Sequence, residues 1–438
     1  MISSEPVIAV GIIQRSERIS GELRQKYRIA QDVIVTGAFS AAIKNGEVIL
    51  YGGKEIELLR GKEIVFSPLN GGEFTLHEVT IGLQFHWERK EDQTFQGSLR
   101  LLATRNGITA VNVIPVEEYL VSVISSEMSA SAPMELLKAH AITSRSWLVA
   151  MLEMKKKFSN LGIPSQRTIT TETELIRYYD REDHELFDVC ADDHCQRYQG
   201  ITKDVSRSAT DAILQTRGTF LVYDGEICDA RFSKSCGGLS EPFHTTWAET
   251  PVPYLMPVPC SRQNHYAPLS SQAGSEQWIL SSPEAFCNTS DGEILQQILP
   301  SFDQETTDFF RWTVNYTIQE LSDIINKKSG IDFGTVQELV PVHRGPSGRI
   351  TRLKIIGTKR TLIVGKELEI RRWLSPSHLY SSAFVVQKKD DAFILRGAGW
   401  GHGVGLCQIG AAVMAVSGFS AEEIVLHYFR NVELRKLY

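Results

Sequence analysis

Two charged side chains on the apolar faces of neighbouring predicted helices are the first candidates for chemistry in this chain of 438 residues. Val116, Leu120 and Val123 recur at helical spacing after Pro115, and Glu127 takes the next position of that stripe. Burial and the helix dipole both disfavour an anion there, as a general acid requires. We therefore predict that Glu127 is catalytic. The alternative is a helix that ends earlier and leaves Glu127 in water.

The following predicted helix carries a charge of the opposite sign on its apolar face. Met134, Leu137, Ala141 and Leu148 form the stripe, and Arg145 lies on the same side. A guanidinium among apolar side chains needs an anionic or carbonyl partner. Arg145 is therefore predicted to bind substrate or to pair with the carboxylate of the preceding helix, and a purely structural buried salt bridge is the alternative.

A short segment combines two imidazoles with two thiols. His184, Cys190, His194 and Cys195 fall within 12 residues. Four such donors complete a closed tetrahedral zinc site, so the segment predicts a structural zinc ion. The alternatives are free surface thiols beside a chance pair of histidines, or a Cys190–Cys195 disulfide.

A glycine-rich segment stands out near the C-terminus. Five glycines fall between Gly397 and Gly405 around His402, and a helix is predicted from Leu406 onward. Backbone N–H groups at a helix N-terminus suit a polar or anionic ligand, so His402 and Gln408 are predicted to bind substrate. A tight structural turn with a buried His402 is the alternative.

A serine-rich turn is the last candidate. Ser233, Lys234 and Ser235 precede a Gly-Gly pair and are predicted to line a sugar or carboxylate site. Cys236 beside His402 would instead suit a cysteine nucleophile. The alternative is a structural turn that neither binds substrate nor takes part in catalysis.

The elements that position these residues predict an α+β fold in four parts. Residues 1–110 form a β-rich N-terminal region, and 111–259 form the first part of a mixed α/β core. Residues 260–350 form an inserted lobe, and 351–438 complete the core with C-terminal helices.

Local signals predict individual elements within these parts. Helices are expected in two pieces of 115–157 split around 129–133, at 204–217 ended by Gly218, and around 318–326. A hairpin is expected from 220–223 and 227–233 around Asp224-Gly225. Strands are expected at 353–356, 384–387 and 393–396, and Ser420 to Glu423 reads as a capping box for the last helix.

Composition excludes several classes of function. A net charge of −6 without a basic cluster argues against nucleic acid as a partner. No apolar run approaches a membrane span, so the chain is not expected to cross a membrane. The N-terminus has neither a cationic region nor an apolar core, which fits a cytoplasmic protein or one whose leader is omitted. Seven cysteines are too sparse for a disulfide scaffold.

Taken together, these motifs resemble the SpoIID/LytB family, named for stage II sporulation protein D and an amidase enhancer. The likeness runs in order through the segment from Asn112 to Leu120, the segment from Ser126 to Arg145, the motif from Ser233 to Ser240, and Gly399 to Ala411 followed by His427-Tyr428-Phe429. Ser347-Gly-Arg349 also has a counterpart in the family. The resemblance spans roughly residue 100 to the end.

The resemblance implies a protein that acts on peptidoglycan at the cell wall, in the periplasm or outside the cell. Members of the SpoIID branch are lytic transglycosylases that cleave glycan strands freed of stem peptides and leave anhydro-muramic ends. The family's catalytic glutamate falls on Glu127 and an active-site arginine on Arg145, and some members carry a zinc loop where His184 to Cys195 stand. Cys236 and Cys407 depart from serines of the family pattern, and Ile409 departs from an aromatic residue. If the two cysteines are neighbours, they would form a disulfide or a reactive pair.

Two other functions remain open at this point. One is a non-catalytic glycan-binding modifier that enhances a cell-wall amidase, as the LytB branch implies. The other is a cysteine hydrolase that uses Cys236 or Cys407 with His402.

Overall fold

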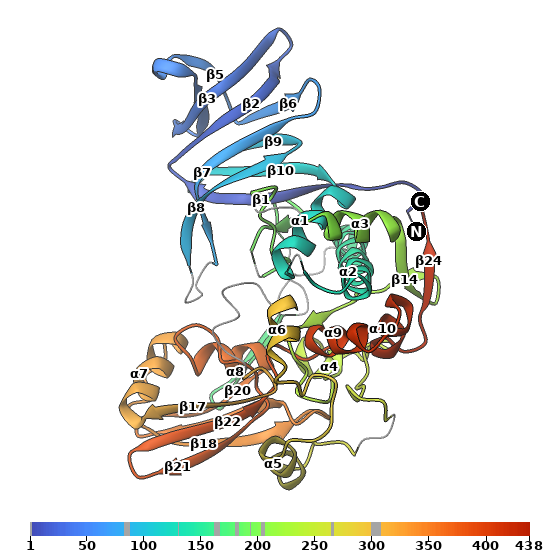
Figure 1. Cartoon of the computed structure of the whole chain (residues 1–438). Helices are drawn as coiled ribbons and strands as arrows, with labels where there is room; N and C mark the ends of the chain where they lie inside the picture. The colour runs from blue at the N-terminus through green and yellow to red at the C-terminus, as the bar shows by residue number, and fades with distance from the viewer. Residues whose placement is uncertain are drawn as a thin grey trace. The chain divides into compact units, whose positions relative to one another are not determined.

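The structure, a computed structural model, describes residues 2–82, 88–129, 131–161, 167–179, 184–192, 194–202, 206–263, 267–298 and 308–438. The chain forms two compact units, each with its own interior (Figure 1). Unit 1 comprises Ser131–Glu182 and Thr219–Lys436, and unit 2 comprises Ile2–Ala130, Asp183–Gly218 and Leu437–Tyr438. Within the described residues, several sheets and ten helices confirm the α+β class.

Unit 2 is built on an 11-stranded sheet, counted over its described residues. Its strands alternate buried and exposed side chains, as in β2, which explains the short apolar runs of the first 110 residues. The strand order is β13-β1-β10-β9-β6-β2-β3-β4-β5, with β7 between β2 and β8. The bounds are β1 Val7–Ser16, β2 Arg18–Ala30, β3 Val33–Lys44, β4 Glu47–Tyr51, β5 Glu57–Gly61, β6 Glu63–Pro68, β7 Glu73–Ile81, β8 Arg89–Gln96, β9 Ser98–Thr104, β10 Gly107–Pro115 and β13 Val189–Cys190.

Two helices of unit 2 follow the predicted pattern. Helix α1 (Val116–Glu127) begins directly after β10, with the fixed φ of Pro115 preparing its first turn. Val116, Leu120 and Val123 are buried, which confirms the apolar stripe. Helix α3 (Arg207–Gln215) is capped by the Ser206 hydroxyl, which accepts a hydrogen bond from the Ala209 amide.

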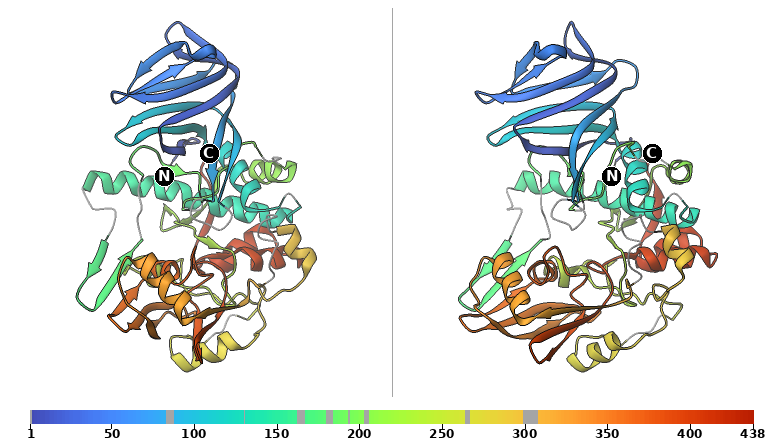
Figure 2. Two further views of the ribbon diagram at one scale, coloured as in Figure 1. Left: turned by 90° about the vertical axis from the view of Figure 1, so that its left-hand side faces the viewer. Right: turned by 60° about the vertical axis from the view of Figure 1, so that its left-hand side comes forward.

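Unit 1 holds one long helix and four smaller sheets within its described residues. Helix α2 (Met134–Leu161) is the long helix seen from the side in Figure 2. The sheets have the orders β11-β12-β20-β19-β18, β15-β14-β24, β17-β22-β21 and β16-β23. Strand bounds are β11 Arg167–Thr170, β12 Glu174–Tyr178, β14 Thr219–Tyr223, β15 Glu226–Ile227, β16 Phe232–Ser233, β17 Arg311–Thr317, β18 Val336–Arg344, β19 Ile350–Gly357, β20 Thr361–Gly365, β21 Phe384–Lys389, β22 Ala392–Ala398, β23 Leu406–Cys407 and β24 Glu433–Lys436.

The other helices of unit 1 are short. They are α4 Phe243–Thr246, α5 Gln272–Leu280, α6 Gly292–Ile298, α7 Ile318–Ser329, α8 Glu367–Trp373, α9 Gln408–Val416 and α10 Ala421–Tyr428. Helix α7 and helix α8 pack with β17 to β22 around one apolar core that includes Leu321, Leu353 and Trp373. The capping box at Ser420 and Glu423 is confirmed, because each side chain bonds the other residue's backbone amide.

Two predicted elements differ from the structure. The second hairpin strand, expected over 227–233, ends at Ile227, and Phe232–Ser233 instead forms β16 beside β23. The helix expected from Leu406 begins at Gln408, because Leu406 and Cys407 are drawn into that same parallel pair. Both errors arise from one pairing between segments more than 170 residues apart.

Candidate functional site

Glu127 is the last residue of α1 and its side chain is half-buried. The predicted position on the inner stripe at the helix C-terminus is therefore confirmed. One carboxylate oxygen, Oε1, accepts a hydrogen bond from the backbone amide of Arg197 at 3.3 Å. The chain then leaves the helix in an extended conformation at Met128, whose side chain is buried.

An aromatic pair lines the interior on the same side of α1. Tyr119 stacks on Tyr198 with ring centroids 5.0 Å apart, and its hydroxyl lies 3.3 Å from Oε1 of Gln196. Burial raises the pKa of Tyr119 well above its ordinary value, so the phenol stays neutral at physiological pH. The Ser122 hydroxyl accepts the Gln199 amide at 3.2 Å. Residues 196–199 are thus held along α1 at several points.

The four predicted metal ligands precede that segment and converge. The ligand atoms of His184, Cys190, His194 and Cys195 all lie within 4.8 Å of one another. Nε2 of His184 is 3.3 Å from Sγ of Cys195, and Nδ1 of His194 is 3.4 Å from the same sulfur. Hydrogen bonds from Cys195, His184 and His194 lower the pKa of the Cys190 thiol against the opposing effect of burial. This donor set can hold a metal ion.

The loop that carries these ligands is anchored on the large sheet. Val10 and Gly11 of β1 pair with Val189 and Cys190 of β13. The Asp188 carboxylate accepts the Ala9 amide at 2.9 Å. Asp183 and Asp193, which directly precede His184 and His194 in the sequence, lie outside the described residues.

Arg145 is fully buried in α2. Its Nη1 donates to the backbone carbonyl of Thr219 in β14 at 3.2 Å, a partner of the carbonyl kind that its burial required. Glu127 belongs to unit 2 and Arg145 to unit 1. The role of Arg145 toward substrate stays a prediction.

Gln408 is also buried, at the start of α9. Its Nε2 lies 3.0 Å from Nε2 of His140 in α2, and the His140 ring packs on Phe232. Burial, with the charge of Lys234, lowers the pKa of His140 to about 3, so the imidazole is neutral and accepts from the amide. Gln408 therefore joins α9 to α2, and substrate binding by it stays a prediction.

The serine-rich turn and the glycine-rich segment lie side by side. Phe232 and Ser233 pair in parallel with Leu406 and Cys407, and Ser235 exchanges both backbone hydrogen bonds with Trp400, at 3.0 and 2.8 Å. The Ser233 hydroxyl is buried without a hydrogen-bond partner among the described residues, and the buried Ser235 hydroxyl lies against the Cys287 thiol. Lys234 is half-buried. The two motifs therefore form one structure, and their roles toward substrate stay predictions.

Alternate glycines give the second motif its shape. Gly399, Gly401, Gly403 and Gly405 all have positive φ, between 72° and 93°. Three of them also meet other backbone or buried side chains so closely that a Cβ would not fit, as at Gly403, where it would lie 2.3 Å from Cζ of Arg349. Left-handed backbone and close approach both require glycine, so the glycine pattern follows from geometry.

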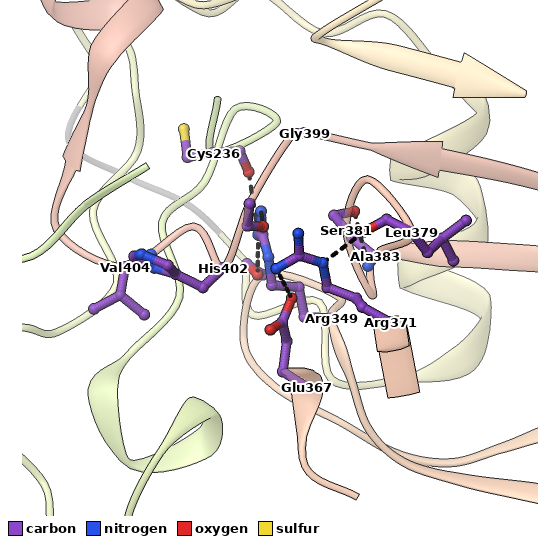
Figure 3. A network of polar contacts seen from close by, with 12 residues as sticks. Cys236, Arg349, Glu367, Arg371, Leu379, Ser381, Ala383, Gly399, His402 and Val404 are labelled. Carbon is purple, nitrogen blue, oxygen red and sulfur yellow. Dashed lines mark hydrogen bonds and ion pairs between the residues drawn. The ribbon is translucent and has the colours of Figure 1, made fainter. Parts of the chain in front are cut away.

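His402 sits between those glycines and is held by its own loop. Its Nδ1 accepts the Val404 amide at 3.0 Å, and its ring packs edge-on against Trp247 at 4.6 Å (Figure 3 shows His402 and Val404). Burial, reinforced by the charges of Arg231, Arg371 and Arg349, lowers the pKa of His402 well below its ordinary value. The imidazole is thus neutral, with Nδ1 engaged within the loop.

Acid is expected to destabilise unit 1, because its buried histidines resist protonation. Burial lowers the pKa of His140 to about 3 and the pKa values of His378 and His427 to about 4. Below about pH 6.5 the unfolded chain binds protons that the folded chain does not. The stability present above pH 6.5 is therefore lost as the pH falls toward 4, with His140 alone contributing up to about 1.4 kcal/mol per pH unit.

Urea unfolding followed by tryptophan fluorescence at pH 7.5, 6 and 5 measures this effect. Six of the seven tryptophans lie in unit 1, so the signal reports on that unit. A midpoint that does not move over this range would contradict the prediction.

A buried polar network, which the sequence did not reveal, supports the glycine-rich segment. Arg349 is fully buried and donates to the carbonyl of Cys236 at 3.2 Å (Figure 3). Its Nη2 donates to the carbonyl of Gly401 at 3.4 Å. It also donates to the Ser347 hydroxyl at 2.9 Å, and Ser347 in turn donates its amide and hydroxyl to the Glu241 carboxylate. The only signal in the sequence was the Ser347-Gly-Arg349 stretch.

Cys236 and Cys407 are neighbours, as the resemblance made possible. The Cys236 amide donates to Sγ of Cys407 at 3.3 Å. No disulfide forms among the described cysteines, and both of these are buried. Burial raises the pKa of the Cys236 thiol well above its ordinary value, which does not favour a thiolate nucleophile.

No helix among the described residues is both long and apolar enough to cross a membrane.

Comparison with known proteins shows which families contain similar sequences. Residues 104–223 match a family described as Stage II sporulation protein, and residues 241–405 match a domain of unknown function, DUF8618. An uncharacterized protein of Brachyspira hyodysenteriae is 28% identical over 375 residues, covering 85% of this chain and 76% of that protein. Stage II sporulation protein D of Bacillus subtilis is 23% identical over 334 residues, covering 75% and 77%.

The amidase enhancer of Bacillus subtilis is 24% identical over 334 residues, which cover 72% of this chain and 40% of that protein. The stage II sporulation match contains Glu127, Arg145 and the whole segment from His184 to Cys195. The match to the sporulation family model and the relatives of both branches, which align along most of the chain, support the SpoIID/LytB family for this protein.

Proposed function

We propose that the protein is a lytic transglycosylase of peptidoglycan, which cleaves the bond between muramic acid and glucosamine in glycan strands freed of stem peptides. The observation that carries the proposal is Glu127. It lies on the inner face at the end of α1, half-buried and held by the Arg197 amide, within the segment that matches the sporulation family.

In the proposed reaction, the Glu127 carboxyl gives its proton to the glycosidic oxygen as the bond to the anomeric carbon breaks. The resulting carboxylate then takes the proton of the muramoyl hydroxyl, which attacks that same anomeric carbon and closes the anhydro ring. Glu127 thus gives one proton and regains one, so it ends the reaction protonated as it began, and no water is consumed. One carboxylate is sufficient because the nucleophile belongs to the substrate, whereas a hydrolase needs two flanking acids.

The remaining predicted residues would bind the glycan. We assign Arg145, Ser233, Lys234, Ser235, His402 and Gln408 to this role on the family resemblance. Ser233 supports it best, since its buried hydroxyl has no hydrogen-bond partner among the described residues. Such a function implies a protein located at the cell wall, outside the cytoplasmic membrane, which fractionation of cells with an antibody to the protein would test.

The His/Cys loop fits a structural zinc ion. Two imidazoles and two thiols whose ligand atoms lie within 4.8 Å supply all four positions of a closed tetrahedral site. When bound, the ion would supply a cross-link and no catalysis. The residues that follow it, 196–199, hold Glu127 and α1, so the loop would position the acid.

Loss of that ion is expected to weaken both stability and turnover. A His184→Ala variant should lose one zinc ion per chain and several kcal/mol of stability in unit 2, because metal binding is coupled to the folding of the loop. Thermal unfolding and elemental analysis measure both effects. His77→Ala is the control, since His77 is exposed and only pairs with Asp92 on the surface. A His184→Ala protein with unchanged metal content would contradict the assignment.

A non-catalytic modifier of a cell-wall amidase is the second candidate function. The observation in its favour is the similarity to the amidase enhancer over 72% of this chain. For such a modifier we expect glycan binding that is unchanged in Glu127→Ala and no turnover by the parent protein. An added amidase should turn over its substrate faster in the presence of the protein.

A further inference from the structure

Four cysteines from four separate segments of unit 1 meet in its interior. Cys236 follows β16, Cys260 lies between α4 and α5, Cys287 lies between α5 and α6, and Cys407 ends β23. Their Sγ atoms all lie within 4.8 Å of one another, and none of the four is more than 2% exposed. We name this group the tetracysteine cluster.

We propose that the tetracysteine cluster binds a structural zinc ion, separate from that of the His/Cys loop, which ties the serine-rich turn and the glycine-rich segment to the intervening loops. The inference does not depend on the enzymatic activity of the protein.

The spacing of the sulfurs fits one tetrahedral ion. A zinc–sulfur bond of about 2.3 Å places the sulfurs of a tetrahedral site about 3.8 Å apart. Sγ of Cys236 and Sγ of Cys287 are 3.7 Å apart. A disulfide would instead need about 2.05 Å. Four thiolates are also the soft donor set that selects zinc over magnesium or calcium.

Hydrogen-bond donors surround the cluster, as expected for sulfur atoms that coordinate a metal ion. The Cys236 amide points at Sγ of Cys407 at 3.3 Å, and the Tyr428 hydroxyl lies 3.2 Å from Sγ of Cys260. Hydrogen bonds of this kind fix the ligands and offset the negative charge that four thiolates bring to one ion. Nη1 of Arg311 donates to the carbonyl of Gly237, next to Cys236, at 3.1 Å and adds a positive charge nearby. Binding of the ion would release the thiol protons to solvent.

The part of the fold that the cluster joins is poor in regular structure. Between β16 and β17, the described residues form only α4, α5 and α6, of four, nine and seven residues. The Cys260 amide donates to the carbonyl of Gly238 at 3.0 Å, and the Phe286 amide donates to the carbonyl of Cys260 at 2.6 Å. These bonds bring the loops to the cluster, and a bound ion would cross-link them there.

Helix α9 packs directly on the cluster. A Cβ at Gly410 would lie 2.4 Å from Sγ of Cys260 and 3.4 Å from Sγ of Cys407. The ion would therefore lie at the junction of α9, the end of the glycine-rich segment and the serine-rich turn. Cys236 and Cys407 stand where the family pattern has serine. In this proposal they are ligands of the same ion as Cys260 and Cys287.

Metal content of the full chain, purified under reducing conditions, tests the proposal. Elemental analysis and native mass spectrometry of the unmodified protein should give two zinc ions per chain. Cys287→Ser should lose one ion, His184→Ala should lose the other, and the double variant should hold none. Cys228→Ser is the matched control, since Cys228 is equally buried in unit 1 but lies outside the cluster, and it should keep both ions.

Cobalt substitution in the unmodified protein and in His184→Ala identifies the ligands without relying on a cysteine variant. The ion that remains in His184→Ala should show the intense thiolate-to-cobalt absorption of a site with four sulfurs. The proposal would be overturned by one ion per chain that is lost with His184→Ala, or by a native mass that shows two disulfides and no second ion. Equal metal content in Cys287→Ser and Cys228→Ser would overturn it as well.

Discussion

Replacing Glu127 by glutamine is expected to reduce glycan cleavage by about 10²- to 10⁴-fold, because the amide cannot give a proton to the leaving oxygen. The substitution keeps the size of the side chain and leaves a carbonyl oxygen to accept the Arg197 amide. Folding should therefore be unchanged, and the loss should appear in kcat rather than in glycan affinity. Peptide-free glycan strands are the substrate, and mass spectrometry of the products gives both rate and bond type.

The control is Glu118→Gln on the same helix. Glu118 is exposed, whereas Glu127 faces inward, so this substitution removes an equal charge from α1 without touching the proposed acid. It should retain the parent rate. Products with hydrated reducing ends, or full activity of Glu127→Gln, would rule out the transglycosylase proposal.

Replacing Arg349 by methionine is expected to destabilise unit 1 by about 3–5 kcal/mol, the usual loss when one partner of a buried charged network is removed. The carbonyls of Cys236 and Gly401 would lose their donor, and the Glu241 carboxylate would lose a nearby positive charge. Burial already raises the pKa of Glu241, and the network opposes that rise. Urea unfolding followed by tryptophan fluorescence measures the change.

Two further variants separate the network from simple loss of charge. Arg352→Met, three residues along on β19, removes an arginine that is 45% exposed and should cost at most about 1 kcal/mol. Adding Glu241→Gln to Arg349→Met should restore part of the stability, since it removes the carboxylate left without compensation. A cost for Arg349→Met as small as that of Arg352→Met would show that the network is not coupled.

Local patterns were sufficient for the elements that carry Glu127 and Arg145. The periodicity of Val116, Leu120 and Val123 after Pro115, and the break expected around 129–133, predicted α1 and α2 closely. The capping box at Ser420 was equally local. Such signals lie within a few residues, and the packing of α1 agrees with them.

Contacts between distant segments could not be predicted in the same way. Because Ser233 pairs with Cys407, the predicted hairpin strand and the predicted start of the C-terminal helix both differ from the structure. No sequence pattern near either residue predicts this pairing. Cys260 and Cys287 have no spacing that marks them as partners, and only the fold brings them to Cys236. The convergence of the His/Cys loop was predictable because its four ligands lie close in sequence.

The alternation of left-handed glycines has a consequence for how this family member can evolve. Positive φ falls on every second residue from Gly399 to Gly405, with Trp400, His402 and Val404 between. Deleting or inserting one residue would move these larger side chains onto left-handed positions, at a cost of roughly 1–2 kcal/mol each. Point changes at the intervening positions are far less costly to the backbone. The length of the segment is therefore constrained in steps of two residues, and homologues should keep its parity even where they exchange its side chains.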